Sequence, residues 1–340
     1  QQNCPDPINQ MGFTKDAQTL DHIIFSIKTI VEKYKRKKQK VYCTFVDFRK
    51  AFDSVCRSAL LLKLSILGIT GNIFNVIKNM YASSTCQLKM SNRLSAKIRI
   101  LKGTEQGHTL SPELFKIFLH DLSALLDREN CPKLLDNIIS HLLWADDLVL
   151  MALDHQTAQD QLNSLAEFCN KWGLEINYSK TSTVVFNDGS RKSKYLSQSK
   201  FIINNTPISI VEDYTYLGIT LHRSGSFIRA TDALRKKGLR ALFSLRKYID
   251  RTVLSCSALT KLFDFLIRPV VSYGAPIWTP YSNCIPDITF LSNSSNINSN
   301  TCRKLFNKIA RYPSETIHLR YLKWCLSVHR RTSNIASWGE

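Results

Sequence analysis

The sequence predicts an α+β fold, because strand-like and helix-like stretches are both present and follow one another in irregular order. The stretch at 41–48, VYCTFVDF, is short, β-branched and aromatic, which is typical of a buried strand. Residues 23–31 place isoleucine and valine at helical spacing, and helical patterns dominate the last third of the chain. With 340 residues and 44% hydrophobic content, the chain can form a core and more than one subdomain.

The first part of the chain is expected to form a helix, a strand, two short helices, a hairpin and a longer helix. Gly68 and Gly71 separate the two short helices, and the hairpin is expected to turn near Asn92. In chain order the predicted ranges are 16–34, 41–48, 58–67, 72–82, 85–101 and about 113–127.

The remainder alternates between the two kinds of element and then becomes helical. We expect strands on both sides of Asp146 and Asp147, and a strand or strand pair in the stretch EINYSKTSTVVF. A polar loop follows, and the segment YTYLGITL leads into two helices. The helices of this part are expected at about 155–172, 228–249 and 256–267.

The charge balance indicates a polyanionic partner. Lys and Arg outnumber Asp and Glu by 46 to 27, a formal net charge of +19, which is more than solubility requires. Nucleic acid is the preferred interpretation over a membrane surface, and a merely basic soluble protein remains an alternative. The helix expected at 228–249 alone carries seven Lys or Arg residues.

The expected setting is soluble and intracellular. No apolar run reaches the roughly 18 residues of a membrane span, and the N-terminal stretch lacks the apolar core of a signal peptide. The ten cysteines are scattered without the spacing of a zinc or redox motif, which predicts reduced thiols. Since the chain begins without Met, we expect a piece of a longer protein.

Carboxylates interrupt or end the most apolar strands. Asp47 ends one predicted strand, and the adjacent Asp146 and Asp147 lie between two others in HLLWADDLVL. Burying a carboxylate costs several kcal/mol unless it is paired, so these residues predict a compensating cation. Hard divalent ions such as Mg²⁺ prefer oxygen ligands, and two of them about 3.5–4 Å apart catalyse in-line phosphoryl displacement. Either carboxylate site alone is more often a cap or a tight turn than a metal site.

The chain resembles the reverse transcriptase domain of non-LTR (LINE-type) retrotransposons, through several motifs that occur in the order typical of that family. The resemblance implies a right-hand polymerase with partial fingers, a palm built on an antiparallel sheet, and a helical thumb. The matching stretches are QMGFTKDAQTLDHI, FVDFRKAFD, GTEQGHTLSP, WADD, WGLEINYSKT, YLG and LIRPVVSYGAPIW.

The resemblance also implies domain limits, expressed in this numbering. Partial fingers would cover 1–40, and the palm 41–212, with finger-side helices at 58–100. A primer-grip hairpin would occupy 213–225, and the helical thumb with a C-terminal extension 226–340. Two positions depart from the family pattern: Thr109 stands where a proline is usual, and Trp144 replaces the commoner Phe or Tyr.

The resemblance assigns roles to the carboxylates and to nucleotide-binding residues. Asp47 and Asp146 would be the main metal ligands, with Asp147 beside them, holding two Mg²⁺ ions, or Mn²⁺ in their place. Lys180 would assist the departing pyrophosphate. Asp53 is expected to cap a following helix instead of binding metal. Phe52 would exclude the ribose 2′-hydroxyl, and Gln106 and Gly107 would contact the nucleotide or template; by composition Phe52 is equally well a core aromatic.

The remaining assignments concern the nucleic acid. The resemblance makes Tyr216, Leu217 and Gly218 a primer grip. Thumb side chains would contact the phosphate backbone of the template–primer duplex, although each is nearly as well explained as a solvated helix face. These thumb residues are Arg235, Lys236, Lys237 and Arg240.

The predicted function is RNA-directed DNA synthesis, in which deoxynucleotides are added to a DNA 3′-hydroxyl by a two-metal mechanism. The partners would be an RNA template, a DNA primer and deoxynucleoside triphosphates, with no membrane, and the oligomeric state is open. The full element would act in the nucleus after a cytoplasmic ribonucleoprotein stage. The alternatives are an RNA-dependent RNA polymerase, a non-catalytic nucleic-acid-binding module and a decayed transposon copy.

Overall fold

The computed structural model describes residues 12, 24–105, 107–126, 129–191, 200–249, 254–278, 317, 320, 321 and 325. The contacts divide the chain into two compact units. The first contains residues 1–218 and 222–225, and the second contains 219–221 and 226–340. The mixture of helix and sheet agrees with the predicted α+β class. Each unit is described by itself.

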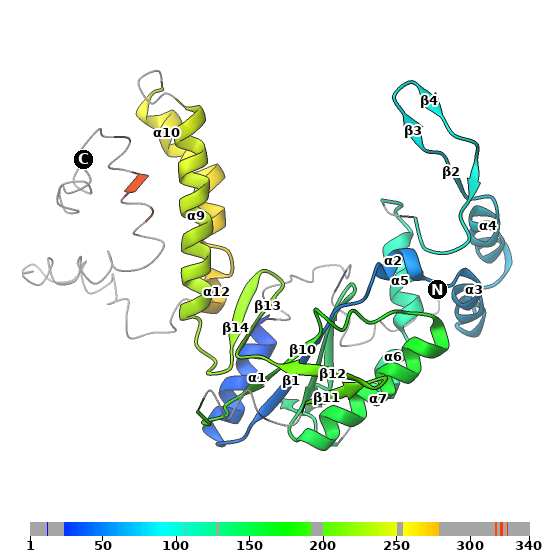
Figure 1. Cartoon of the computed structure of the whole chain (residues 1–340), viewed down its shortest axis with the longest axis horizontal. Coiled ribbons are helices and arrows are strands. Elements are labelled where there is room, and N and C mark those ends of the chain that lie inside the picture. The colour runs from blue at the N-terminus through cyan, green and yellow to red at the C-terminus, as the bar shows by residue number, and fades with distance from the viewer. Residues whose placement is uncertain are drawn as a thin grey trace, which may run out of the picture. The chain divides into compact units, whose positions relative to one another are not determined.

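A six-stranded sheet organises the first unit (Figure 1). Its order is β11-β12-β10-β1-β9-β8, and every neighbouring pair is antiparallel except β10 and β12, which run parallel. The strands are β1 (Val41–Val46), β8 (His141–Trp144), β9 (Asp147–Ala152), β10 (Ser182–Phe186), β11 (Phe201–Ile203) and β12 (Thr206–Ile210). The expected antiparallel sheet is therefore present, with one parallel pair at its β10–β12 junction.

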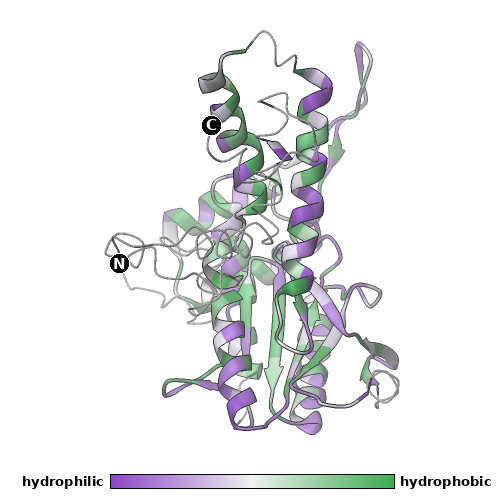
Figure 2. Ribbon diagram, turned by 90° about the vertical axis from the view of Figure 1, so that its left-hand side faces the viewer, coloured by the Kyte–Doolittle hydropathy of each residue, from purple (hydrophilic) through white to green (hydrophobic). Residues whose placement is uncertain are grey.

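The strand β1 lies inside the sheet, between β10 and β9. Both of these neighbours come from much later in the chain. Phe45 and Cys43 are completely buried, and Thr44 and Thr183 share a buried hydroxyl–hydroxyl hydrogen bond of 2.8 Å. Figure 2 shows the strands as mainly hydrophobic, while the surrounding helices carry mixed hydrophobic and hydrophilic residues. A strand covered on both faces is expected to lack polar alternation, as the β-branched stretch at 41–46 does.

The longest helix against this sheet is α7 (His155–Trp172), which matches its predicted limits. It begins where the Asp154 carboxylate accepts the Thr157 amide at 2.8 Å, and it ends at Gly173, whose φ of +73° suits a glycine. Leu162 and Leu165 on this helix are fully buried in the main core. Both end signals are local, which explains why the prediction was accurate.

The single helix expected at about 113–127 is wrong, because two helices occupy that range. They are α5 (Ser111–Leu119) and α6 (Leu122–Leu126). The ammonium of Lys63, from α3 (Arg57–Ile66), donates to the Phe118 carbonyl and to the Asp121 carboxylate. The Phe118 carbonyl would accept from residue 122 in a continuous helix, so the buried lysine favours a break there.

A thin β-structure follows the two predicted short helices, which are α3 and α4 (Gly71–Ala82). It turns at Ser91 and Asn92, as predicted, and projects beyond α4 (Figure 1). We call residues 85–99 the ribbon. Its strands are β2 (Thr85–Cys86), β3 (Lys89–Met90), β4 (Arg93–Leu94) and β5 (Ile98–Arg99), with β2 paired to β5 and β3 to β4.

Shorter elements complete the first unit. Its first described helix is α1 (Phe25–Arg36), and the part of the expected helix before residue 24 lies outside the described residues. The others are α2 (Ala51–Ser54), β6 (Lys133–Leu134), β7 (Asn137–Ile138) and β13 (Asp213–Tyr216). The strand β13 pairs with β14 (Ile219–His222), of which residues 219–221 are assigned to the second unit.

The expectation that Asp53 caps a helix is not met. Asp53 lies within α2 itself, in its first turn. The next helix, α3, begins at Arg57, and the residue before it, Cys56, makes no side-chain cap. The cap was assigned from sequence distance alone, and the short helix α2 takes up that interval.

The second unit is helical in its described part. Its helices are α9 (Ile228–Tyr248), α10 (Cys256–Leu262), a π-helical turn at Phe263–Ile267, α11 (Arg268–Val271) and α12 (Ala275–Trp278). The predicted ranges of 228–249 and 256–267 are confirmed. Gly238 is buried on α9, and a Cβ there would lie 2.3 Å from the Val271 side chain and 2.7 Å from Ile317. A glycine is therefore needed for this close packing of the helices.

Within the described ranges, no helix has both the length and the hydrophobicity needed to cross a membrane. Cys43 and Cys169 are buried thiols in no disulfide, and burial raises the pKa of Cys169 to about 12. Such thiols are inert at neutral pH, as expected of structural cysteines.

Candidate metal-binding site

The strand register places Asp47 beside Asp147. In the antiparallel pair β1–β9, Val46 lies opposite Leu148. The next residue on β1 is Asp47, and the preceding residue on β9 is Asp147, so both leave the sheet at the same level. Two segments separated by about a hundred residues therefore present carboxylates at one edge of the sheet, as the sequence predicted.

The third carboxylate belongs to a two-residue turn. Trp144 pairs with Asp147 at the end of the β8–β9 hairpin, which leaves Ala145 and Asp146 to form the turn. Ala145 has a φ of +58°, a left-handed conformation that costs an alanine roughly 1–2 kcal/mol. The turn is therefore strained, and its strain is held in place by the apolar strands on either side.

The electrostatics of the three carboxylates are unfavourable. Burial and the charges of Asp146 and Asp47 raise the pKa of Asp147 to about 6, and the Lys180 ammonium opposes this rise. Burial is also the main cause of the raised pKa of Asp146, with a further contribution from Asp47. A nearby cation would relieve this repulsion. Keeping these carboxylates ionised without a cation therefore costs free energy, as expected for a site that binds metal.

The donor chemistry fits a hard divalent cation, while the carboxylates are not drawn together into a closed ligand set. In the described part of the chain, no group of three or more His, Cys, Asp or Glu side chains is close enough to hold an ion. The Asp47 charge contributes to the raised pKa values of both Asp146 and Asp147, so a cation such as Mg²⁺ would have to draw the three carboxylates together to complete the set.

Asp47 is fixed by the segment after α7. The Asn177 side-chain amide donates to its carboxylate at 2.8 Å, and the Asn177 backbone amide donates to the Asp47 carbonyl at 2.8 Å. The Lys180 ammonium lies 3.8 Å from the same carboxylate and its side chain is 67% exposed. The structure thus places Lys180 at the carboxylate site with its ammonium open to solvent, where a phosphate could reach it.

Two tyrosines of β13 lie beneath this site, and sequence reasoning missed one of them. The Tyr214 ring stacks on Phe45 with centroids 4.6 Å apart, and burial together with the Asp47 and Asp147 charges raises its pKa. The Tyr216 hydroxyl donates to the Asp147 carbonyl at 3.1 Å. The signal was available: residues two apart on a strand face the same side, so YTY could have indicated a pair.

The expected primer-grip residues are placed differently from one another. The Tyr216 side chain is only 3% exposed, so it positions Asp147 from below, and only its backbone is available for contact with a primer. Leu217 and Gly218 form the turn of the β13–β14 hairpin with φ values of +47° and +83°. Their role in primer binding stays a prediction.

The nucleotide-binding predictions fall on a neighbouring segment. Phe52 is half-buried on α2, and its ring stacks on Phe115 with centroids 4.4 Å apart. The Phe52 carbonyl accepts the Thr104 amide at 2.9 Å, which joins this segment to the start of the GTEQG motif. Gly107 is exposed with a φ of +85° and open space around it. Gln106 lies outside the described residues.

Gly12 contacts the carboxylate turn, a role that sequence reasoning did not assign to it. A Cβ at this position would lie 2.1 Å from the Ala145 amide nitrogen and 3.0 Å from the Trp144 carbonyl carbon. Both neighbours are backbone atoms, so no side-chain rotation can relieve the overlap. Glycine is therefore the only residue that fits at position 12 against this turn in its present conformation.

The four predicted phosphate-binding residues lie on α9, and two of them are already paired. The Asp232 carboxylate accepts from Arg235 at 2.8 Å and lies 2.9 Å from the Lys236 ammonium, and these bonds lower its pKa. Lys237 and Arg240 are exposed. Surface pairs of this kind are weak, so phosphates can replace Asp232 at little cost.

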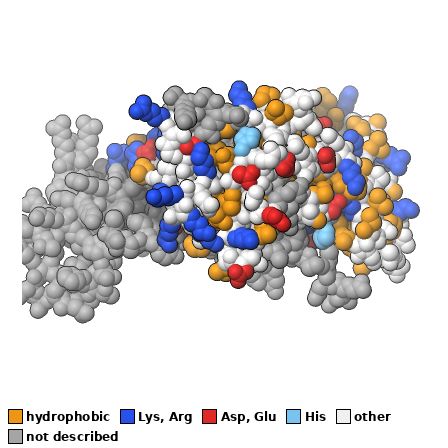
Figure 3. Space-filling view, turned by 90° about the horizontal axis from the view of Figure 1, so that it is seen from below, with side chains coloured by type: hydrophobic (Ala, Val, Ile, Leu, Met, Phe, Trp, Pro, Cys, Tyr) orange, Lys and Arg blue, Asp and Glu red, His pale blue; other side chains and the backbone are white. Residues whose placement is uncertain are grey.

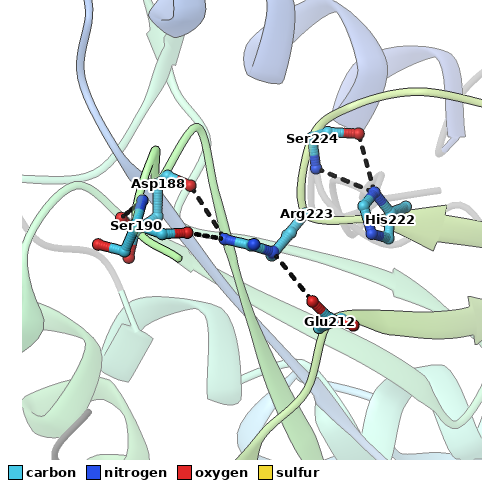
Figure 4. A network of polar contacts seen from close by, with 6 residues as sticks. All are labelled: Asp188, Ser190, Glu212, His222, Arg223 and Ser224. Carbon is cyan, nitrogen blue, oxygen red and sulfur yellow. Dashed lines mark hydrogen bonds and ion pairs between the residues drawn. The ribbon is translucent and has the colours of Figure 1, made fainter. Parts of the chain in front are cut away.

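Arg223, at the end of β14, is held by the loop after β10 (Figure 4). Its guanidinium donates to the Asp188 and Ser190 carbonyls at 3.2 and 2.9 Å and lies 3.5 Å from the Glu212 carboxylate. His222 and Ser224 are bonded to each other beside it at 2.8 Å. These contacts fasten the residues before and after the β13–β14 hairpin to the sheet that carries the carboxylates.

The arrangement is typical of one class of protein. Carboxylates presented by two adjacent strands of an apolar sheet are oxygen donors of the kind that enzymes of divalent-metal-dependent phosphoryl transfer use. The family is given by comparison with known proteins. The model of the reverse transcriptase (RNA-dependent DNA polymerase) family matches residues 2–221, and the chain belongs to that family.

Its relatives are polymerases of non-LTR retrotransposons. The chain is 27% identical over 266 residues to the Pol polyprotein of the R2 element of Bradysia coprophila, covering 72% of this chain and 30% of the relative. It is 24% identical to the RNA-directed DNA polymerase of the jockey element of Drosophila funebris, covering 80% of this chain and 29% of that one. The predicted resemblance is confirmed.

A longer match is the R2 polyprotein of Popillia japonica, at 27% identity over 85% of this chain and 46% of the relative. The chain thus spans less than half of each of these three relatives. Among solved structures, Candida tropicalis telomerase with a fragment of telomeric RNA has a TM-score of 0.45 at 15% identity, over 99% of this chain and 53% of that chain.

Proposed function

We propose that this chain is the polymerase portion of a non-LTR retrotransposon protein and synthesises DNA on an RNA template. The observation that carries the proposal is the meeting of Asp47 with the Asp146–Asp147 turn at one edge of the sheet. The raised pKa values of Asp146 and Asp147 favour a bound cation over bare carboxylates. Asp47, Asp146 and Asp147 would hold Mg²⁺, or Mn²⁺ in its place, and the metal would activate the primer 3′-hydroxyl and stabilise the leaving pyrophosphate.

The subdomains of a right-hand polymerase map onto the described elements. The six-stranded sheet with α7 corresponds to the palm, and α3, α4 and the ribbon correspond to the finger side. The β13–β14 hairpin takes the place of the primer grip, and the second unit that of the thumb. Phe52 would lie under the sugar of the incoming nucleotide and exclude a 2′-hydroxyl.

Three further assignments follow from membership of the family. Lys180, with its exposed ammonium near Asp47, would neutralise charge on the pyrophosphate. Arg235, Lys236, Lys237 and Arg240 would contact the backbone of the RNA–DNA duplex. The whole protein would act in the nucleus on nicked chromosomal DNA, after a cytoplasmic stage as a ribonucleoprotein.

Primer extension tests the proposal. A DNA primer annealed to an RNA template should be extended with deoxynucleotides in the presence of Mg²⁺ and not in EDTA. Asp146→Asn and Asp47→Asn should each reduce extension about a thousandfold or more, since the metal contributes several kcal/mol to the transition state. The matched control is Asp136→Asn, because Asp136 is an exposed aspartate outside the carboxylate site.

Two outcomes would contradict the proposal. Extension that survives both substitutions would exclude the carboxylate mechanism. Tight template–primer binding without any extension by the unmodified chain would favour the non-catalytic alternative. Phe52→Ala separates the DNA polymerase from an RNA polymerase: ribonucleotide use should rise if Phe52 is the gate, and an unchanged preference would remove that role from Phe52.

A further inference from the structure

The ribbon exposes basic side chains that have no part in the carboxylate site. The ribbon and the three residues that follow it, 85–102 together, contain five basic residues and no acidic one. No ion pair forms between these five side chains and any other residue of the described chain, and all five are exposed. The basic residues are Lys89, Arg93, Lys97, Arg99 and Lys102.

Apolar side chains are exposed on the same ribbon. Leu88, Met90 and Leu94 have exposed fractions of 61%, 75% and 64%. The register sets Lys89 opposite Leu94 and Met90 opposite Arg93, so each face of the tip presents one cation beside one apolar side chain. An isolated two-stranded ribbon of this kind buries no core and is only marginally stable in water, which favours a ligand that covers it.

The root of the ribbon, in contrast, is rigid. The Arg57 guanidinium is buried, and it donates to the carbonyls of Tyr81, Ile100 and Gly103 at 2.9, 2.7 and 2.9 Å. It also lies over the Tyr81 ring at 4.6 Å. A buried guanidinium that donates through Nε and Nη1 to three carbonyls, on both sides of the ribbon, fixes the direction in which the ribbon leaves the unit.

This root is joined to the segment that carries the proposed nucleotide gate. The Gly103 amide donates to the Val55 carbonyl at 2.8 Å, one helical turn from Phe52. A Cβ on Gly103 would lie 2.8 Å from the Asp53 carbonyl oxygen, so the two backbones are in close contact. The ribbon therefore starts beside the α2 segment that carries Phe52, the residue proposed above to lie under the sugar of the incoming nucleotide.

We propose that the ribbon binds the unpaired part of the RNA template, ahead of the nucleotide-binding position. The cations would contact phosphates, while Leu88, Met90 and Leu94 would pack against the faces of unstacked bases. The absence of acidic residues from this stretch matches a polyanion. This inference rests on the proposed function for the identity of the strand, and it adds a contact outside the carboxylate site.

Binding measurements with two substrates test it. One is a DNA primer on an RNA template that extends past the primer end as a single strand, and the other is the same hybrid without the extension. Fluorescence anisotropy without nucleotides gives Kd for each, over a range of salt concentrations. The ribbon variant combines Lys89→Gln, Arg93→Gln and Lys97→Gln.

A matched control removes the same charge elsewhere. It combines Arg36→Gln, Lys37→Gln and Lys38→Gln in the exposed basic run at the end of α1 and the turn that follows. Figure 3 shows Lys and Arg side chains gathered on the part of the surface where α1 lies. Both triple variants alter only exposed side chains, and equal thermal unfolding will show that both are folded.

The ribbon variant should bind the extended substrate on the order of tenfold to a hundredfold more weakly at moderate salt, with a salt slope reduced by about 2. Its Kd for the substrate without the extension should stay close to that of the unmodified chain. The control should lose the same small factor on both substrates. Met90→Ser with Leu94→Ser should weaken binding of the extended substrate and leave the salt slope unchanged.

Three results would overturn the inference. The first is an equal loss of affinity by the ribbon variant on both substrates, and the second is a loss no greater than that of the control. The third is an unchanged Kd for the Met90 and Leu94 double variant, which would point to a protein partner for the apolar side chains. Since no nucleotides are present, these binding measurements do not depend on whether the chain synthesises DNA. A failure of the proposed function would therefore be distinguishable from a failure of this inference. Extension-dependent binding by a chain that synthesises no DNA would contradict only the catalytic proposal.

Discussion

The β8–β9 hairpin and the β3–β4 hairpin both turn through two residues, and the first residue of each turn has a positive φ: +58° at Ala145 and +51° at Ser91. The strands of the first are buried within the six-stranded sheet, with Leu148 and Val149 completely inaccessible. The strands of the second are exposed on both sides, at Met90 as at its neighbours.

The difference lies in what each hairpin can hold. A turn supported by a buried sheet can keep carboxylates together against their mutual repulsion, because the packed strands resist its opening. A ribbon without a core cannot hold an unfavourable cluster, and its side chains are free to adapt to a flexible strand of nucleic acid. The two hairpins thus share their local turn geometry. The packing around each hairpin determines whether it can hold a cluster of carboxylates or can adapt to a binding partner.

The largest effect on this comparison is expected from Gly12→Ala. The added Cβ must displace the backbone of Trp144 and Ala145, and a displacement of about 1 Å at a catalytic group can cost on the order of a hundredfold in rate. Primer extension should fall by that factor, while Kd for template–primer stays the same. Gly189→Ala is the control, because a Cβ there meets nothing within 4 Å. Unchanged extension would show that the turn yields easily.

The second effect concerns protons competing with metal at the buried hairpin. Below pH about 6, where Asp147 gains a proton, the apparent affinity for Mg²⁺ should fall by up to about tenfold per pH unit. Without metal the effect of pH on stability has the opposite sign. The folded-state pKa lies above the ordinary value for an aspartate, so the stability that protonation contributes is lost as pH rises through about 6. Thermal unfolding with and without Mg²⁺ across pH measures both.

Asp147→Asn provides the check on that assignment. It should remove most of the pH dependence of Mg²⁺ stabilisation in this range. It should also raise the melting temperature of the metal-free protein at neutral pH, because a disfavoured charge is gone. A pH dependence that persists in this variant would mean that a group other than Asp147 takes up the proton.

A smaller effect is expected from Tyr216→Phe, which removes only the hydroxyl that holds the Asp147 carbonyl. Loss of one such hydrogen bond costs about 1 kcal/mol of folding stability, and extension should slow by a few-fold. Tyr248→Phe is the control, since the Tyr248 side chain is 77% exposed. If primer affinity fell while the rate stayed constant, the hydroxyl would belong to primer binding instead of to the positioning of Asp147.

The smallest effect comes from relieving both turns with Ala145→Gly and Ser91→Gly. In each case the relief of positive φ is largely offset by the greater freedom of glycine in the unfolded chain, so unfolding free energies should change by less than about 1 kcal/mol. Only Ala145→Gly should alter primer extension, by loosening the carboxylate turn. Equal activity losses in the two variants would contradict the division of roles between the hairpins.

The sequence predicted features that local chemistry determines. The limits of α7 follow from Asp154 and Gly173, and the turn of the ribbon from Ser91 and Asn92. The proximity of Asp47 to the other carboxylates was predictable because apolar strands that end on acidic residues belong in one sheet.

Other features depend on contacts between distant segments, which no pattern in the sequence displays. The break after α5 arises from the Lys63 ammonium, and Tyr216 is buried because the β13 segment passes under Phe45. The requirement for glycine at position 12 appears only once that residue lies against the turn. These are effects of packing, and they add detail around carboxylates that the sequence had already singled out.

The place of β1 in the middle of the sheet has a consequence for synthesis of the protein in the cell. Both of its neighbours, β9 and β10, are translated long after it, with α3, α4, the ribbon, α5 and α6 in between. Until the ribosome has added those strands, an apolar segment with two unpaired edges remains open to aggregation or to capture by a chaperone. The nascent chain therefore brings its three carboxylates to one edge only in the same late step that closes its sheet.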